Sequence, residues 1–222
     1  MIFTIARQEL RRLFLSPLAW TILAVVQFIL AYMFLSHVDY YANVQSQLLG
    51  MDGGYGVTET VVAPLFANAA IVLLLVAPLT SMRLITEERR NKTLALLVSA
   101  PLSMTEIVLG KYLGLVFFLL IQVALIALMP LSLLFGGGLD VGMFAAGLLG
   151  LTLLLAGFAA VGLFMSTLTQ HQTVAAVSTF GVLLAFWILD WAGQGTGGGV
   201  LAYLSLLNHY EPFLKGVFDT RD

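Results

Sequence analysis

A segment near the middle of the chain, both charged and apolar, is the clearest candidate for a chemical role. The run Glu87–Lys92 places two carboxylates directly before two guanidinium groups, those of Arg89 and Arg90. If residues 93–100 form a short helix, its apolar side chains share one face, because they are spaced i, i+3 and i+4. An apolar face surrounded by charge is typical of a segment that docks into a groove of a soluble partner. A solvated turn whose arginines only set the topology is the alternative interpretation. The apolar face would consist of Leu94, Leu97 and Val98.

Signals for the end of one helix and the start of another follow directly. Pro101 ends the short helix, because proline lacks the amide hydrogen that a helix interior needs. Ser103 and Glu106 have the spacing of a capping box, in which each side chain pairs with the backbone amide of the other residue. The carboxylate of Glu106 also lies favourably near the positive end of the helix dipole. We therefore predict that a long helix begins at Ser103.

No pattern of a catalytic site accompanies this segment. An intramembrane hydrolase would need a nucleophile paired with a base, or a zinc motif such as H-E-x-x-H, and the sequence contains neither. The phosphate-binding pattern G-x-x-x-x-G-K-[ST] is also absent, because Tyr112 follows Gly110-Lys111 and Thr105 stands where its first glycine would be. We therefore predict no catalytic residue, no metal site and no cofactor in this chain.

A few isolated polar residues have two readings each. His209 with Glu211 lacks a third ligand at helical spacing, so we interpret these residues as solvated rather than metal-binding. His37 with Asp39 is an equally weak metal signal. Asn68 and Gln122 fall within apolar runs, where they either form hydrogen bonds between packed helices or line a pathway. Packing is the favoured interpretation for both.

The elements that must position these residues are predicted from the hydrophobicity of the chain. The 222 residues are 60% hydrophobic and 10% charged, with a mean hydropathy of +0.99. A soluble domain needs more polar side chains to cover its surface. The apolar residues fall in long runs, and a helix of about 20 residues crosses a bilayer. We therefore predict an all-α integral membrane protein. Its predicted spans are residues 17–36, 60–82, 106–135, 141–167 and 173–191.

An amphipathic helix is predicted before the first span, over residues 1–15. At 100° per residue the chain separates into an apolar and a polar face, which is the pattern of a helix that lies in the membrane interface with its arginines toward anionic head groups. Ser16-Pro17 then starts a new helix, with serine as the cap and proline in the first turn. Residues 16–222 form a single transmembrane domain. The apolar face comprises Ile2, Phe3, Ala6, Leu10, Leu13 and Phe14, and the polar face Thr4, Arg7, Gln8, Arg11 and Arg12.

The positions of lysine and arginine predict the orientation. Eight of the ten lie at the N-terminus or around the loop 83–105, and the loop 37–59 contains none. Basic residues near helix ends favour the cytoplasmic side, so the N-terminus and the loop 83–105 are predicted to be cytoplasmic. The middles of the spans carry no Asp, Glu, Lys or Arg, which argues against an ion-coupled transporter or channel.

The segment 192–222 is predicted to lie outside. It begins with a glycine-rich stretch and becomes too polar after Asn208 to cross a bilayer. We interpret residues 201–207 as a short helix that dips into the outer leaflet. Because an odd number of spans leaves this tail outside, we expect a sixth span beyond residue 222.

The central segment resembles the ABC-2 permease family. In that family an acidic-acidic-basic run, then a leucine-rich stretch that begins with Thr-Leu, a proline and Gly-Lys connect the second and third helices. The outer tail is most similar to permeases of the gliding-motility and nitrous-oxide-reductase-maturation branch. One departure is Lys92, where the family usually has glycine. The matching residues here are Glu87-Glu88-Arg89-Arg90, Thr93-Leu94-Ala95-Leu96-Leu97, Pro101 and Gly110-Lys111.

The resemblance implies a type V exporter-like transmembrane domain in a bacterial inner membrane. It implies a second permease copy, two copies of a separate ABC ATPase that carry the ATP and magnesium, and an accessory protein on the outer side. No nucleic acid is implied. The loop residues from Glu87 to Pro101 would couple ATP hydrolysis to the permease. A membrane anchor that transports nothing, and a small ion-independent transporter, are the alternatives, and the substrate is not assigned.

Overall fold

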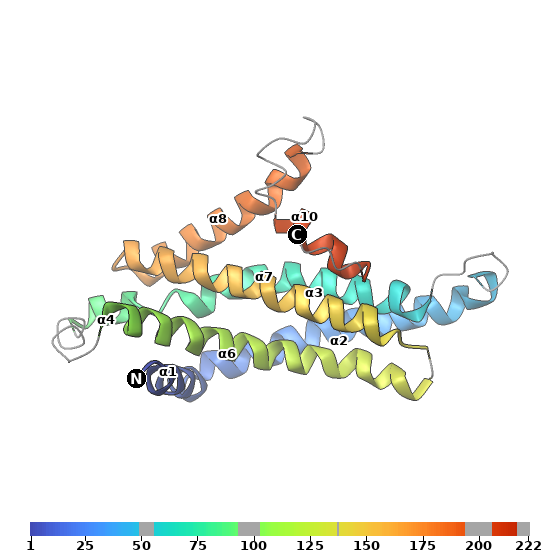
Figure 1. Ribbon diagram of the computed structural model, residues 1–222, viewed down its shortest axis with the longest axis horizontal. Helices are drawn as coiled ribbons and strands as arrows, with labels where there is room; N and C mark the ends of the chain where they lie inside the picture. The colour runs from blue at the N-terminus through green and yellow to red at the C-terminus, as the bar shows by residue number, and fades with distance from the viewer. Residues whose placement is uncertain (49–55, 93–102, 137, 194–205, 217–222) are drawn as a thin grey trace.

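The computed structural model describes residues 1–48, 56–92, 103–136, 138–193 and 206–216, and every element in these ranges is a helix. Four helices run along the long axis of the molecule, and the other helices lie at one end and along one side (Figure 1). The helices along the axis are α2 (Pro17–Leu48), α3 (Ala63–Ser81), α6 (Met104–Leu131) and α7 (Val141–Leu168). The others are α1 (Ile2–Leu15), η1 (Thr58–Val62), α4 (Thr86–Arg90), η2 (Ser132–Gly136), α8 (Gln172–Gly193) and α10 (Leu206–Leu214).

Four of the described helical stretches are long and apolar enough to cross a membrane. They correspond to the first four predicted spans, and α8 adds a shorter apolar stretch, Gln172–Ile188, where the fifth was predicted. Their apolar residues surround the helix, as expected when one side packs on protein and the other faces lipid. The chain is thus a multi-pass membrane protein. The four stretches are Pro17–Val44, Thr58–Arg90, Met104–Leu134 and Val141–Leu168.

Helix α3 lies at the centre of the bundle and packs against α2, α7 and α8. Its residues Leu65, Ala69 and Leu73 are fully buried. Phe66 is 1% exposed and stacks near Phe144 of α7, with ring centroids 5.9 Å apart. By contrast α2 presents large apolar side chains outward, such as Phe28, which is 77% exposed. We assign such side chains to lipid, because the bilayer takes up apolar surface that water would not.

Helix α2 is longer than the sequence predicted. It continues to Leu48, through the start of the segment 37–59 that was predicted to be a loop, so that prediction is wrong for residues 37–48. No glycine or proline interrupts these residues, and polar side chains are compatible with a helix that extends beyond the apolar region. Asn43 donates a hydrogen bond from its side chain to the carbonyl of Asp39, at 2.9 Å.

The described part of the tail contains one helix, α10, which covers Leu206–Leu214. Residues 194–205, and with them most of the helix predicted over 201–207, lie outside the described ranges. The aromatic pair Tyr210 and Phe213 decides the place of α10, because residues three apart share a helix face that packs on α7. Tyr210 donates a hydrogen bond to the carbonyl of Phe66, at 3.0 Å. Burial raises the pKa of Tyr210, so its hydroxyl stays protonated and available as a donor.

The predicted orientation can be measured with single cysteines, because the chain has none. Asn91 follows α4 and Gly56 precedes the stretch of η1 and α3, and both residues are exposed. Helix α4 and the start of α3 lie at opposite ends of the bundle (Figure 1). In intact cells we expect Gly56→Cys to react with a membrane-impermeant maleimide and Asn91→Cys to react only after the membrane is opened. Labelling of Asn91→Cys from outside would invert the topology.

Candidate functional site

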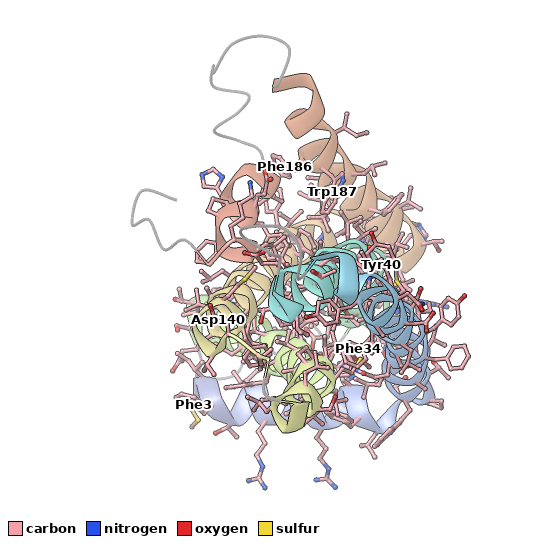
Figure 2. All side chains as sticks on the ribbon, turned by 90° about the vertical axis from the view of Figure 1, so that its right-hand side faces the viewer. Phe3, Phe34, Tyr40, Asp140, Phe186 and Trp187 are labelled. Atoms are coloured by element: carbon pink, nitrogen blue, oxygen red, sulfur yellow. The ribbon has the colours of Figure 1, made fainter. Side chains whose placement is uncertain are left out.

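Helix α1 lies across the end of the bundle rather than along it. Figure 1 shows it end-on and Figure 2, turned by 90°, shows it lengthwise, with Phe3 near one end. Ser16 has extended backbone angles and separates α1 from α2, as the Ser-Pro signal predicted. The indole nitrogen of Trp20 donates to the carbonyl of Phe14 at 2.9 Å and ties the two helices together at this corner. The sequence therefore folds its first helix into an elbow.

The elbow helix crosses α6 at very short range because α6 has glycine at two positions one turn apart. A Cβ placed on Gly110 would lie 2.7 Å from Cβ of Ile5. A Cβ placed on Gly114 would lie 2.8 Å from Cβ of Glu9 and 3.0 Å from the carbonyl oxygen of Ala6. Small residues spaced in this way allow helix backbones to approach closely. The crossing fixes the position of α1 on α6.

Lys111, between these glycines, is buried with two carboxylates. It is 1% exposed, and its Nζ lies 3.2 Å from Oε2 of Glu9 and 2.7 Å from Oε1 of Glu88. Glu9 is itself 8% exposed. A buried charge is tolerated only when opposite charges and hydrogen bonds compensate its lost hydration. One ammonium group therefore joins α1, α4 and α6.

Arg12 extends this cluster toward the surface. Its guanidinium lies 3.0 Å from Oε1 of Glu87 and 3.9 Å from Oε1 of Glu88, and its side chain is 43% exposed. We call Glu9, Arg12, Glu87, Glu88 and Lys111 the elbow charge network. Its outer part is screened by water and contributes less than its buried part. The network therefore connects α4 to both α1 and α6.

The structure separates the predicted site residues into two groups. Glu87 and Glu88 belong to the elbow charge network, whereas the sequence had indicated only a charged run beside the apolar face. Arg89 is partly buried and Arg90 exposed, and both line a basic cavity of about 450 Å³. Its other walls include Lys92 and the turn between α7 and α8. Thr93, Leu94, Leu97, Val98 and Pro101 lie outside the described residues.

A family of known proteins matches almost the whole chain. The family described as ABC-2 family transporter protein matches residues 3–215, from α1 to α10. The chain belongs to this family. A comparison with curated proteins found no match. As an ABC-2 family membrane protein it is a permease subunit of an ABC transporter, which agrees with the multi-pass fold.

The departure of this ABC-2 permease from the family pattern at Lys92 has a visible structural setting. Lys92 has φ of +57°, in the left-handed region that glycine adopts most easily. It directly follows Asn91 at the end of α4, where left-handed residues commonly terminate helices. The usual glycine at this position thus suits the local backbone, and Lys92 adopts the same conformation at some cost in strain.

The predicted capping box of the permease is confirmed. The amide of Glu106 donates to Oγ of Ser103 at 3.2 Å, and the amide of Ser103 donates to Oε2 of Glu106 at 3.1 Å. Helix α6 therefore begins where the sequence predicted, and this start places Lys111 in its second turn. The cap is local, whereas the contacts of Lys111 come from other helices.

The face of α1 that packs on the ABC-2 permease core differs from the apolar face predicted from the sequence. Arg7 and Arg11 are exposed, as predicted, but Arg12 pairs with Glu87 instead of facing head groups alone. Glu9, which was assigned to neither face, is one of the two buried residues of α1. Two signals could have revealed it: the G-x-x-x-G spacing around Lys111, and an unmatched lysine early in an apolar helix.

Two of the isolated polar residues, His37 and Asn68, contact each other. No group of three His, Asp or Glu able to hold a metal occurs in the described part of the chain. Asn68 lies 3.2 Å from Nε2 of His37, a contact between α3 and α2 that favours the packing interpretation. Gln122 is fully buried, and its side-chain amide has no hydrogen-bond partner among the described residues.

Proposed function

We propose that this chain is the membrane-spanning subunit of an ATP-driven ABC-2 transporter in which a separate ATPase drives the helices. The observation that carries the proposal is the elbow charge network, which links α4 to α1 and α6 through one buried lysine. The following segment, residues 93–102, is where the ATPase would dock. Its apolar residues Leu94 and Leu97 would enter a groove of the ATPase, with Arg90 at the rim.

The network explains how such a docking would act on the membrane domain. When the ATPase closes on ATP, it would displace the docked segment and α4 with it. The buried pair between Lys111 and Glu88 is costly to break, because either charge alone would be left uncompensated. The displacement would therefore rotate α1 and α6 together instead of bending the loop. Two such subunits with two ATPases would form the working complex.

The direction and cargo of this transport are narrower proposals. Export, or mechanical transmission to an outer accessory protein, agrees with the absence of charged residues from the middles of the spans. The likeness of the tail to the gliding-motility and nitrous-oxide-reductase-maturation branch is a proposal on family resemblance alone. We assign no substrate.

Co-purification of the ATPase tests the coupling role. In Leu97→Asp an unpaired carboxylate would enter a desolvated groove, and we expect retention of the ATPase to fall at least tenfold, or about 1.4 kcal/mol. Arg90→Ala at the wetter rim should change retention by less than about fivefold, or about 1 kcal/mol. Leu97 lies outside the apolar stretches and Arg90 is the last residue of one of them, so both variants should reach the membrane in normal amounts. A Leu97→Asp subunit that keeps its ATPase stoichiometrically would support a membrane anchor or a simple turn instead.

A further inference from the structure

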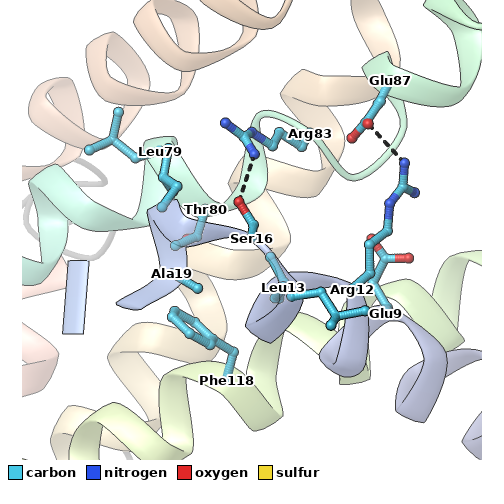
Figure 3. Close-up of a pocket in the computed structure, with 12 residues that line it drawn as sticks. Glu9, Arg12, Leu13, Ser16, Ala19, Leu79, Thr80, Arg83, Glu87 and Phe118 are labelled. Carbon is cyan, nitrogen blue, oxygen red and sulfur yellow. Dashed lines mark hydrogen bonds and ion pairs between the residues drawn. The ribbon is translucent and has the colours of Figure 1, made fainter. Parts of the chain in front are cut away.

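A second site lies beside the elbow charge network, where α1 turns into α2. A cavity of about 220 Å³ opens there between the elbow, the end of α3 and α6. One water occupies about 30 Å³ in the liquid, so the cavity holds a group much larger than one water. Figure 3 shows Arg83 on one side of it, reaching toward Ser16, and Ala19 and Phe118 on another. Glu9, Arg12 and Glu87 of the elbow charge network form part of its lining, whereas Arg83 has no role in the coupling proposal.

Arg83 is the group in this cavity that calls for a ligand. Among the described residues its guanidinium has one hydrogen bond, from Nη1 to Oγ of Ser16 at 3.3 Å. Its Nε is buried and has no hydrogen-bond partner among the described residues, and no carboxylate there forms an ion pair with it. The other charged residues of the cavity are already matched: Arg12 with Glu87, and Glu9 with Lys111. A buried guanidinium donor without an acceptor is costly, so an acceptor from outside the chain would stabilise it.

The walls of the cavity indicate the nature of that acceptor. The rim residues Leu15 and Leu79 are 75% and 42% exposed, and they join the apolar outer surface of the bundle. Ala19 and Phe118, which lie deeper, are buried. The site therefore has one charged corner and an apolar opening. A phospholipid has the same division between a phosphodiester and its acyl chains.

The charge balance favours a lipid over a free anion. The lining carries two carboxylates, Glu9 and Glu87, and two guanidinium groups, Arg12 and Arg83, so its net charge is zero. Such a site does not concentrate small anions from solution, because long-range attraction depends on net charge. The site must therefore select its ligand by direct contact. A planar guanidinium can donate two parallel hydrogen bonds to the oxygens of a phosphate group. A lipid already in the adjoining leaflet reaches the site without that attraction.

We infer that the elbow cavity binds one phospholipid of the inner leaflet, with its phosphodiester on Arg83 and Ser16 and its chains leaving past Leu15 and Leu79. The inference is independent of the proposed coupling to an ATPase. A lipid seated there would contact α1, α2, α3 and α6 together. It would stabilise the elbow in the position that the structure shows, since a ligand stabilises the state that binds it.

Native mass spectrometry of the purified, delipidated full chain in detergent tests the inference. The probe is dioleoyl-phosphatidylglycerol, with dioleoylglycerol as the analogue without phosphate and sodium phosphate as the anion without chains. We expect one phosphatidylglycerol to bind more tightly than the rest, and Arg83→Gln to weaken that event about tenfold or more, as loss of a charged hydrogen bond predicts. Arg11→Gln, which removes an exposed arginine away from the cavity, should leave it unchanged.

Three results would overturn the inference. The first is that the parent chain and Arg83→Gln bind phosphatidylglycerol with equal affinity. The second is that sodium phosphate alone displaces phosphatidylglycerol, which would make the site a free-anion site. The third is an Arg83→Gln chain that binds lipid normally but loses its ATPase, because Arg83 would then serve a carboxylate of that protein. If Arg83→Gln proves unstable, Arg83→Lys serves as the test variant, because lysine keeps the positive charge but cannot form the paired hydrogen bonds of a guanidinium. We expect it to bind about threefold or more weakly, and unchanged affinity would equally refute the site.

Discussion

Replacing Lys111 with methionine is expected to destabilise the protein by about 3–5 kcal/mol, the cost of removing one partner from a buried ion pair. Methionine fills a similar volume, so the loss is one of charge rather than of packing. Glu9 and Glu88 would then face each other at a site where Lys111 is 1% exposed. Because the network joins α1, α4 and α6, we expect both a midpoint of thermal unfolding lower by roughly 10 °C and weaker retention of the ATPase.

The matched control is Lys215→Met. Lys215 forms an ion pair with Glu211 at 2.9 Å, but both side chains are more than 60% exposed. Exposed pairs of this spacing contribute little, so we expect a change of less than about 0.5 kcal/mol. Neutralising the carboxylates as well, in the triple variant with Glu9→Gln and Glu88→Gln, should recover part of the lost stability. A Lys111→Met chain as stable as the parent would show that the buried pair does not hold the elbow.

The second large effect is expected at Gly114, where α6 touches the backbone of α1. In Gly114→Val the new Cβ would lie 2.8 Å from Cβ of Glu9 and 3.0 Å from the carbonyl of Ala6, before the two methyl groups are counted. Neither neighbour is the end of a flexible side chain, so α1 must move away from α6. Overpacking of this kind costs about 1–3 kcal/mol. The same movement would lengthen the contact between Glu9 and Lys111.

Gly157→Ala is the control for this prediction. A Cβ at Gly157, on α7, would meet nothing within 4 Å. Alanine favours a helix over glycine by up to about 1 kcal/mol, so we expect unchanged or slightly higher stability. Thermal unfolding and co-purification of the ATPase should be measured for Gly114→Val and Gly157→Ala side by side. Equal behaviour of the two variants would mean that the crossing of α1 and α6 tolerates separation and does not carry the coupling.

The features that could be predicted from sequence are those whose causes are local. The apolar runs predict membrane helices because a bilayer leaves the backbone few other ways to satisfy its hydrogen bonds. The capping box at Ser103 and Glu106 sets the start of α6 within one turn. The Ser16-Pro17 pair places the elbow. The family pattern identifies the loop after α4, although its apolar residues lie outside the described ranges.

The end of α2 and the place of α10 needed the tertiary structure. The end of a helix depends on its capping residues and on the elements that pack against it. The polar residues His37 and Asp39 did not end α2, which reaches Leu48. The position of α10 depends on Tyr210, whose hydrogen bond joins it to Phe66, 144 residues away. Neither the end of α2 nor the contact of Tyr210 with Phe66 has a periodic signal in the sequence.

The site itself shows the same division between local and distant causes. The sequence by itself determined that Glu87 and Glu88 belong to a charged run and that Lys111 lies early in the long helix that starts at Ser103. Only the fold decided that Lys111 is buried and that Glu9, 102 residues away, is its partner. A charge becomes buried through the approach of other helices, and here that approach depends on Gly110 and Gly114, which lack the Cβ atoms that would hold α1 away.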